Sequence, residues 1–156
     1  GMEFGLKPGH TSSIRRIEGG MLSYHADADI HTNPYELGLD RLVDLEMEAD
    51  FIGKSALRHI KVDGPKRKQI GLILDADPLT GPNTTFWDIN RDGHSIGKVT
   101  SAVYSPRLKQ NIALAMVEAD HAVIGVDVEV VTQSGPTPAK ITNRPFFDPK
   151  KSIAAA

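Results

Sequence analysis

The segment from residue 24 to residue 31 holds the densest group of side chains that could do chemistry in this chain. His25, Asp27, Asp29 and His31 alternate with small or apolar residues. If the segment were a β-strand, its period of two would place all four side chains on one face. Imidazole and carboxylate groups are ligands for zinc or manganese. Because acidic loops that contain histidine are common on solvated surfaces, we expect a solvated segment here and no metal site.

A second group of candidate binding residues precedes this segment. Arg15, Arg16 and Glu18 fall on or near one predicted helix, and Tyr24 follows it. Arg16 or Glu18 could line a ligand cavity, and either could equally form a structural ion pair or bond to nearby backbone. The Tyr24 ring could pack on a ligand while its hydroxyl forms a hydrogen bond, or it could be a core tyrosine.

No pattern in the chain indicates a catalytic nucleophile. The chain has no cysteine, which excludes disulfides, thiolate metal sites and a cysteine nucleophile, and which is typical of a reducing cytoplasm. Ser105 lies in Tyr-Ser-Pro rather than in a Gly-x-Ser-x-Gly elbow, and no motif links a histidine to it. A turn between strands is its expected role. We therefore expect no catalytic residue in this chain.

Charge and hydropathy also exclude several classes of partner. A formal net charge of −2 gives no general attraction to nucleic acid or to anionic membranes. The basic run at residues 66–68 could contact RNA or phosphate, but a solvated linker is the simpler interpretation. No apolar run approaches the roughly 20 residues that cross a bilayer. We expect a cytoplasmic protein with no nucleic-acid or membrane partner.

Three short helices are predicted before residue 63. Ile14, Ile17 and Met21 recur at helical spacing after a Thr-Ser-Ser cap, and Gly-Gly ends that helix. Asn-Pro at residues 33–34 is typical of a second helix start, with asparagine as the cap and proline at the first helical position. The third helix is predicted over residues 54–60. The side chains expected to be buried in the second and third helices are Tyr35, Leu39, Leu42, Ala56, Leu57 and Ile60.

Strand patterns follow a polar linker at residues 63–68. Val126, Val128 and Val130 alternate with acidic residues, which is the period of a half-buried strand. Similar short runs, separated by turn residues, occupy residues 69–74, 84–89, 95–103, 111–117 and 138–142. Six short strands at this spacing predict a small antiparallel β-barrel or sandwich.

Motifs spread over residues 11–147 resemble one known family. Gly-Lys-Val-Thr-Ser at residues 97–101, followed by a Ser-Pro corner and a returning strand at residues 105–113, resembles the C-terminal barrel of the glycine-cleavage T-protein (aminomethyltransferase) family. Arg-Ile-Glu-Gly-Gly-Met at residues 16–21 is similar to the family's Arg-Leu-Glu-Ala-Gly-Leu helix. The remaining matches are Tyr24 and Asp27 at its Tyr-Gly-x-Asp turn, residues 33–39 at its Thr-Pro-x-Glu-x-Gly-Leu helix start, and residues 50–57 at its Asp-Phe-Ile-Gly segment.

The resemblance implies an α+β fold. Residues 1–64 would be the C-terminal portion of a folate-binding domain, residues 65–150 a six-stranded antiparallel β-barrel, and residues 151–156 a disordered tail. The family's Tyr-Gly-x-Asp match would place residues 24–27 in a connecting turn.

The resemblance also implies an activity for the complete protein, which would move a one-carbon unit from an amine or sulfonium donor to tetrahydrofolate. The family's catalytic aspartate lies upstream of the part matched here, so we expect this chain alone to be inactive. The expected partners are folate, a small one-carbon donor and the missing N-terminal part of the same polypeptide, with a carrier protein as a further candidate.

Two positions depart from the family pattern. Ser12 stands where the family's helix carries an arginine that helps to hold folate, and Arg41 stands where an aromatic residue often follows Gly-Leu. Arg15 or Arg41 could supply the lost positive charge for the glutamate tail of folate. The expected folate- or substrate-binding residues are therefore Arg15, Arg16, Glu18, Tyr24 and Arg41. The dimethylsulfoniopropionate demethylase and dimethylglycine-demethylating branches, which use other donors, stay open.

Two other functions also stay open. A non-catalytic module of the same fold could bind a ligand or a partner protein without any catalytic aspartate. A folate-binding relative in RNA modification or iron–sulfur assembly should offer a basic face or a cysteine motif, whereas this chain is mildly acidic and has no cysteine. We rank that relative last.

Overall fold

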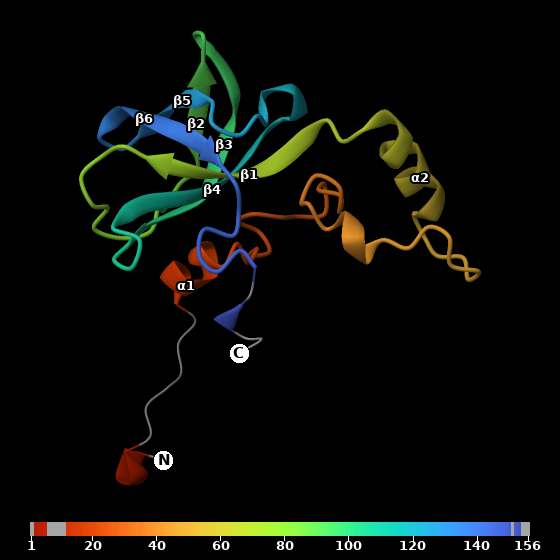
Figure 1. Ribbon diagram of the computed structural model, residues 1–156, viewed down its shortest axis with the longest axis horizontal. Helices are drawn as coiled ribbons and strands as arrows, with labels where there is room; N and C mark the ends of the chain where they lie inside the picture. Colours follow the sequence, from red (N-terminus) through yellow and green to blue (C-terminus); the bar gives the residue numbers. More distant parts are fainter. Residues whose placement is uncertain (1, 6–11, 151, 154–156) are drawn as a thin grey trace.

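Six antiparallel strands close into a barrel in the C-terminal part of the chain, from residue 67 onward (Figure 1). The computed structural model describes residues 2–5, 12–150 and 152–153. Around the barrel the strands follow the order β1-β4-β3-β2-β5-β6, and β6 pairs with β1 to close it. The strands are β1 Arg67–Leu74, β2 Trp87–Arg91, β3 His94–Ser105, β4 Gln110–Glu118, β5 Asp127–Thr132 and β6 Gly135–Thr142. The predicted α+β fold with a six-stranded barrel is confirmed, and the sandwich alternative is wrong.

Alternating side chains fill the inside of the barrel. In β1, Ile70, Leu72 and Leu74 belong to the interior core, because successive strand residues point to opposite faces. Gly71 lies between them on the outer face, where the C-terminal segment crosses β1. A Cβ atom at Gly71 would lie 2.9 Å from the Phe146 ring, so only glycine permits this close approach.

The short helix α1 (Ser13–Glu18) covers part of the outer face of the barrel. Ile17 of α1 forms a second apolar cluster with Val103 of β3 and with Ile112 and Leu114 of β4. For this reason β4 is buried on both faces, and its burial pattern does not alternate. Figure 1 shows α1 lying beneath the barrel, next to the C-terminal segment.

An arm, defined here as residues 39–66, links this helical region to β1 and projects away from the barrel (Figure 1). It contains a one-turn 3-10 helix, η2 (Asp40–Leu42), and the longer helix α2 (Lys54–Asp63). Two further one-turn helices, η1 (Met2–Phe4) and η3 (Ala119–His121), lie outside the arm. No helix in the described part of the chain is long and apolar enough to cross a membrane.

The helix predicted to start at residue 33 is wrong. Residues 34–38 form consecutive turns instead. The Asn33 side chain does act as a cap, since its Oδ1 accepts hydrogen bonds from the backbone nitrogens of Tyr35 and Glu36, both at 3.1 Å. Gly38 then adopts a φ of 66°, and this left-handed conformation ends the helical turn before a second can form.

Smaller predictions also differ from the structure. Met21 is 58% exposed, because the chain leaves α1 at Gly19 before reaching it. The strand predicted over residues 84–89 begins only at Trp87.

The third predicted helix extends to Asp63, and its predicted apolar face at Leu57 and Ile60 is only half-buried. Leu42 is exposed and Ala56 is exposed, whereas Tyr35 and Leu39 are half-buried. Of the predicted tail at residues 151–156, residues 151 and 154–156 lie outside the described residues.

Candidate functional site

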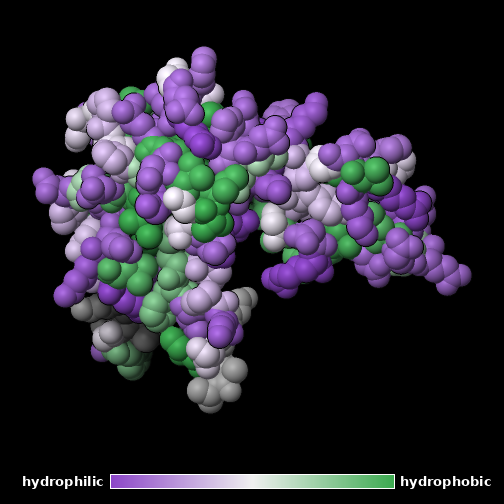
Figure 2. Space-filling view, turned by 45° about the horizontal axis from the view of Figure 1, so that its top comes forward, coloured by the Kyte–Doolittle hydropathy of each residue, from purple (hydrophilic) through white to green (hydrophobic). Residues whose placement is uncertain are grey.

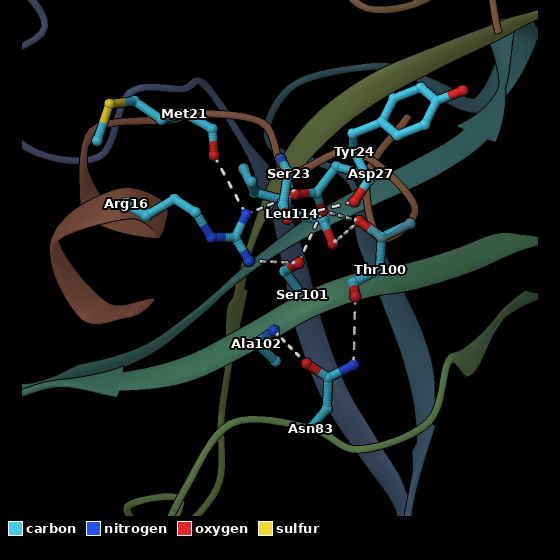
Figure 3. Close-up of polar contacts among 10 residues, drawn as sticks. All are labelled: Arg16, Met21, Ser23, Tyr24, Asp27, Asn83, Thr100, Ser101, Ala102 and Leu114. Carbon is cyan, nitrogen blue, oxygen red and sulfur yellow. Dashed lines mark hydrogen bonds and ion pairs between the residues drawn. The ribbon is translucent and has the colours of Figure 1, made fainter. Parts of the chain in front are cut away.

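The buried carboxylate of Asp27 organises the contact between the N-terminal segment and the barrel (Figure 3). Its Oδ2 pairs with the Arg16 guanidinium at 2.5 Å and accepts the backbone N–H of Ser23 at 2.9 Å. Its Oδ1 accepts the hydroxyls of Thr100 at 2.6 Å and Ser101 at 2.7 Å. With four donors, two on each oxygen, this carboxylate has no lone pair left for a metal.

A β-bulge in β3 lets two neighbouring residues reach the same carboxylate. The register with β4 shifts between Val99 and Ser101, so Thr100 is an extra residue in β3. Adjacent side chains of a regular strand point to opposite faces, whereas a bulge can turn both toward one side. The Thr100 hydroxyl oxygen also lies 3.1 Å from the Leu114 carbonyl of β4, so its single proton is shared between that carbonyl and the Asp27 carboxylate.

Among the described residues, the Arg16 guanidinium forms all of its hydrogen bonds within this cluster. Besides Asp27, its guanidinium donates to the Ser101 hydroxyl at 2.9 Å and to the Met21 carbonyl at 3.2 Å. Its side chain is 23% exposed, against 0% for the Asp27 side chain. Arg16 therefore positions the turn at residues 23–28, which contains Tyr24, rather than presenting a free cation.

Glu18 fastens α1 to two other parts of the barrel domain. Its buried carboxylate accepts the Ser105 hydroxyl at 2.6 Å, at the corner between β3 and β4. Its backbone carbonyl accepts the N–H groups of Phe146 and Phe147, at 2.9 Å and 3.0 Å. The Arg107 guanidinium lies 4.0 Å from the carboxylate and 4.1 Å from the Phe147 ring centroid.

Arg144, which the sequence patterns did not single out, joins the same region from the C-terminal segment. Its guanidinium donates to the Leu37 carbonyl and, at 3.5 Å, to the Gln69 carbonyl. Burial lowers the pKa of the Arg144 guanidinium from its ordinary value, and the nearby Asp27 carboxylate opposes that shift. An arginine two residues after the last strand was the available signal, but nothing in the local pattern showed that the chain folds back here.

A hollow of about 590 Å³ lies beside this cluster, between the turn at residues 24–26 and the segment 83–86. Tyr24 lines it and is 57% exposed, with its ring 4.4 Å from the His25 ring in an edge-to-face contact. Phe86 lines it from the barrel side and is 48% exposed. The Lys98 ammonium lies 4.3 Å from the Phe86 ring centroid. An adjoining hollow of about 70 Å³ shares His25 and Phe86.

The structure does not bring the five predicted binding residues together. Arg16 and Glu18 are engaged with the barrel, and Tyr24 lies at the hollow. Arg15 is exposed on α1 and Arg41 is exposed on the arm. Neither guanidinium forms an ion pair with another described residue. The sequence patterns did not single out Phe86, which lines the hollow, or Lys98, which lines the adjoining smaller hollow, because no local motif distinguishes those residues from ordinary surface.

The alternation of His25, Asp27, Asp29 and His31 does not form a strand. The segment is a series of turns, in which His25 has a φ of 71° and Asp29 accepts the backbone N–H of His31 at 2.9 Å. Within the described ranges, no group of three or more histidine, aspartate or glutamate side chains could hold a metal ion. The Asp27 cluster is therefore an ionic support for the turn that contains Tyr24.

Comparison with known proteins agrees with this architecture. The family description "Glycine cleavage T-protein C-terminal barrel domain" matches residues 67–148, which is more than half of the chain. The chain belongs to the glycine-cleavage T-protein family. One sequence match to a family member covers 94% of this chain and therefore includes both the barrel and the preceding α1 region.

Several glycine-cleavage T-protein relatives are similar over most of the chain. An aminomethyltransferase of Synechococcus sp. (strain RCC307) is 36% identical over 149 residues, covering 94% of this chain and 40% of its own length. A dimethylsulfoniopropionate demethylase of Ruegeria pomeroyi is 33% identical over 141 residues, covering 90% of this chain and 38% of its own length. The chain therefore spans about two fifths of the length of these relatives.

A solved structure of this family has the same fold. The crystal structure of the glycine cleavage system aminomethyltransferase T from Bartonella henselae superposes with a TM-score of 0.78 at 24% identity. The match covers 87% of this chain and 38% of that one. The fold common to the two therefore includes more than the barrel.

Proposed function

We propose that this chain is the C-terminal part of a tetrahydrofolate-dependent one-carbon transferase, and that a preceding part of the same polypeptide completes its ligand cavity. Residues 1–64 would then belong to the folate-binding domain and residues 65–150 to the barrel, with the boundary between α2 and β1. This chain would supply binding and positioning groups, and the preceding part the catalytic acid. The short coverage of the relatives supports this division.

The observation that carries the proposal is the unpaired apolar surface of the arm. Lys54 is the only buried residue of α2, and Val62 in the same helix is 85% exposed. Ile52, just before α2, is fully exposed. Figure 2 shows apolar patches along the arm at the right of the view. Helices in proteins draw most of their stability from packing an apolar face, so this arm is built to pack against something further.

The hollow beside Tyr24 suits a ligand with aromatic rings and carboxylate groups. Two half-exposed aromatic rings, Tyr24 and Phe86, offer stacking area. Lys98 offers a positive charge next to them. When bound, tetrahydrofolate would accept the one-carbon unit. The residues of this chain would bind and orient its rings, while Arg15 or Arg41 would attract its glutamate carboxylates.

The ionic support beneath the hollow has a positioning role in this proposal. Arg16 and Asp27 hold the turn that contains Tyr24 against the barrel bulge. Glu18 holds α1 against Ser105. These groups would set the distance between the Tyr24 ring and the barrel, and hence the width of the hollow.

The donor in this proposal is either an amine or a sulfonium compound. The relatives named aminomethyltransferase are up to 37% identical to this chain, and the dimethylsulfoniopropionate demethylase is 33% identical. Since this difference is small, the proposal covers both donors. If the donor is an amine, a carrier protein is a candidate partner.

Calorimetric titration with tetrahydrofolate tests the proposal. The complete polypeptide should bind folate, whereas residues 1–156 alone should bind it far more weakly, because only part of the cavity wall is present. A micromolar complex with residues 1–156 alone would contradict the incomplete cavity. A complete polypeptide that binds no folate would contradict the cofactor and favour a non-catalytic binding module.

Variants of the complete polypeptide test the residue roles. Tyr24→Ala should weaken folate binding by about tenfold through the loss of stacking area. Arg15→Ala and Arg41→Ala should each be compared with Arg91→Ala, a barrel arginine whose ion pair with Asp92 is exposed. At least one of the first two should weaken folate binding while Arg91→Ala does not. Equal folate affinities in the three arginine variants would contradict the proposed charge role of Arg15 and Arg41.

A further inference from the structure

A second pocket, of about 420 Å³, lies at one mouth of the barrel, away from the turn that contains Tyr24. Its walls are the long β1–β2 connection on one side and the β5–β6 hairpin on the other, with Trp87 at the start of β2. Mouths of β-barrels are common ligand sites, and this volume is within the usual range of about 300–1,000 Å³ for such sites.

Trp87, the only tryptophan in the chain, forms part of this wall. It is 6% exposed, and its indole packs in the barrel core. The Nε1–H donor of Trp87 has no acceptor among the described residues. Buried indole N–H groups usually have a hydrogen-bond partner, and a ligand in the pocket could provide one.

The remaining chemistry of the wall indicates the kind of ligand. Hydroxyl groups are concentrated on it, and none of the described lining residues is lysine, arginine or histidine. Asp77 is the one acidic side chain among them. A wall without cations offers no charge partner to phosphate or carboxylate ligands, whereas hydroxyls and a carboxylate can exchange hydrogen bonds with a neutral ligand. The hydroxyl-bearing lining residues are Thr80, Thr84, Thr132, Ser134 and Thr137.

We propose that this barrel-mouth pocket binds a neutral, hydroxyl-rich small molecule of about monosaccharide size. A ligand hydroxyl oxygen accepts the Trp87 Nε1–H, and other ligand hydroxyls donate to the Thr80 and Thr84 oxygens and to the Asp77 carboxylate. The Thr132 and Thr137 hydroxyls are already hydrogen-bonded to each other and to the Gly135 carbonyl. The site is separate from the hollow beside Tyr24, since the two share only Asn83 and Thr84 at their edges. Its existence does not depend on the one-carbon function.

The single tryptophan makes the proposal directly measurable. The full chain is titrated with myo-inositol and with D-glucose while Trp87 emission is followed. At least one should produce a saturable change with a dissociation constant of about 10 mM or tighter. An emission that stays unchanged, or drifts linearly, with both compounds would overturn the proposal.

Two neighbouring threonines provide a matched pair of variants. Thr84 lines the pocket and Thr85 does not, while both are exposed. Thr84→Val should weaken binding by about threefold to tenfold, the value of one hydrogen bond, and Thr85→Val should leave it unchanged. Trp87→Phe, followed by calorimetry, should weaken binding by a similar factor because it keeps a ring but removes the donor. Unchanged binding in both Thr84→Val and Trp87→Phe would place the ligand elsewhere and overturn the assignment.

Discussion

At the scale of single residues, the decisive feature is that Thr100 and Ser101 both donate to Asp27. This is possible only because β3 is bulged at that point. The buried carboxylate then recruits Arg16, which lies 85 positions before Ser101 in the chain. A local irregularity in one strand thus determines where the N-terminal segment docks and where Tyr24 lies.

Asp27→Asn should lower the free energy of unfolding by about 3 kcal/mol, because it leaves the Arg16 guanidinium beside a neutral partner in a largely buried site. Urea unfolding of the full chain measures this. Asp127→Asn is the matched control, since its ion pair with Lys140 is exposed on both sides and should be worth about 0.5 kcal/mol or less. Equal losses in the two variants would show that the Asp27 cluster is no stronger than a surface pair.

For Gln69 we expect a substitution to raise the free energy of unfolding rather than lower it. Gln69 is 7% exposed, and neither its Nε2 nor its Oε1 has a hydrogen-bond partner among the described residues. Replacing such a group by an apolar one of similar shape removes a desolvation cost. Gln69→Met should therefore raise the free energy of unfolding of this chain by about 1 kcal/mol, while the exposed Gln133→Met should change it little. A loss of stability in Gln69→Met would mean that the amide does find a partner.

At the scale of elements, β4 stands out because it is buried on both faces. It pairs with β1 on one side and β3 on the other, and α1 covers its outer face. Close packing against β3 requires glycine at residue 97. A Cβ atom there would lie 2.7 Å from the Val117 Cα and in collision with the Met116 carbonyl oxygen.

Gly97→Ala should therefore destabilise the chain by about 2 kcal/mol or more, because backbone atoms on both strands must move. Gly81→Ala is the matched control, since a Cβ at that position meets open space and its φ is not in the left-handed region. This control should be neutral or slightly stabilising. Thermal unfolding of both variants distinguishes them, and a similar midpoint for the two would refute the packing argument.

At the scale of the whole molecule, the barrel and the arm differ in completeness. All residues of the interior core lie between Ile70 and Ile141. The partly buried residues that pack against this core lie in the same range. The arm, by contrast, leaves much of its apolar surface uncovered. We therefore expect the barrel to fold independently and the arm to need a further packing partner.

A fragment of residues 66–148 should unfold cooperatively, but with lower stability than the full chain. Removing α1 uncovers the outer apolar face at Ile112 and Leu114, which Ile17 otherwise covers. Loss of one buried isoleucine is worth about 2–3 kcal/mol. Calorimetric unfolding of fragment and full chain tests this, and a broad, uncooperative transition in the fragment would contradict a barrel domain that folds alone.

Local patterns were sufficient for the strands and for the family, and the family resemblance then favoured a barrel over a sandwich. Period-two alternation in β5 and β6 and the Ser-Pro corner at residues 105–106 are properties of a few consecutive residues. The family was identified from the order of short motifs along the chain, because each motif is also made of a few consecutive residues. The helix predicted at residue 33 failed because a correct cap was followed by Gly38, whose left-handed backbone ended the turn.

The site was decided only by the tertiary structure. Arg15, Arg16, Glu18 and Tyr24 are close in sequence, yet they face solvent, a buried carboxylate, the β3–β4 corner and a hollow respectively. Their partners lie on β3 and on the segment after β6, and both depend on strand register and on chain reversal. Contacts between residues more than 70 positions apart, such as that of Asp27 with Thr100, leave no local trace in a sequence. Composition and periodicity indicate which face of an element is buried, but only the tertiary structure determines which residues of other elements pack against that face.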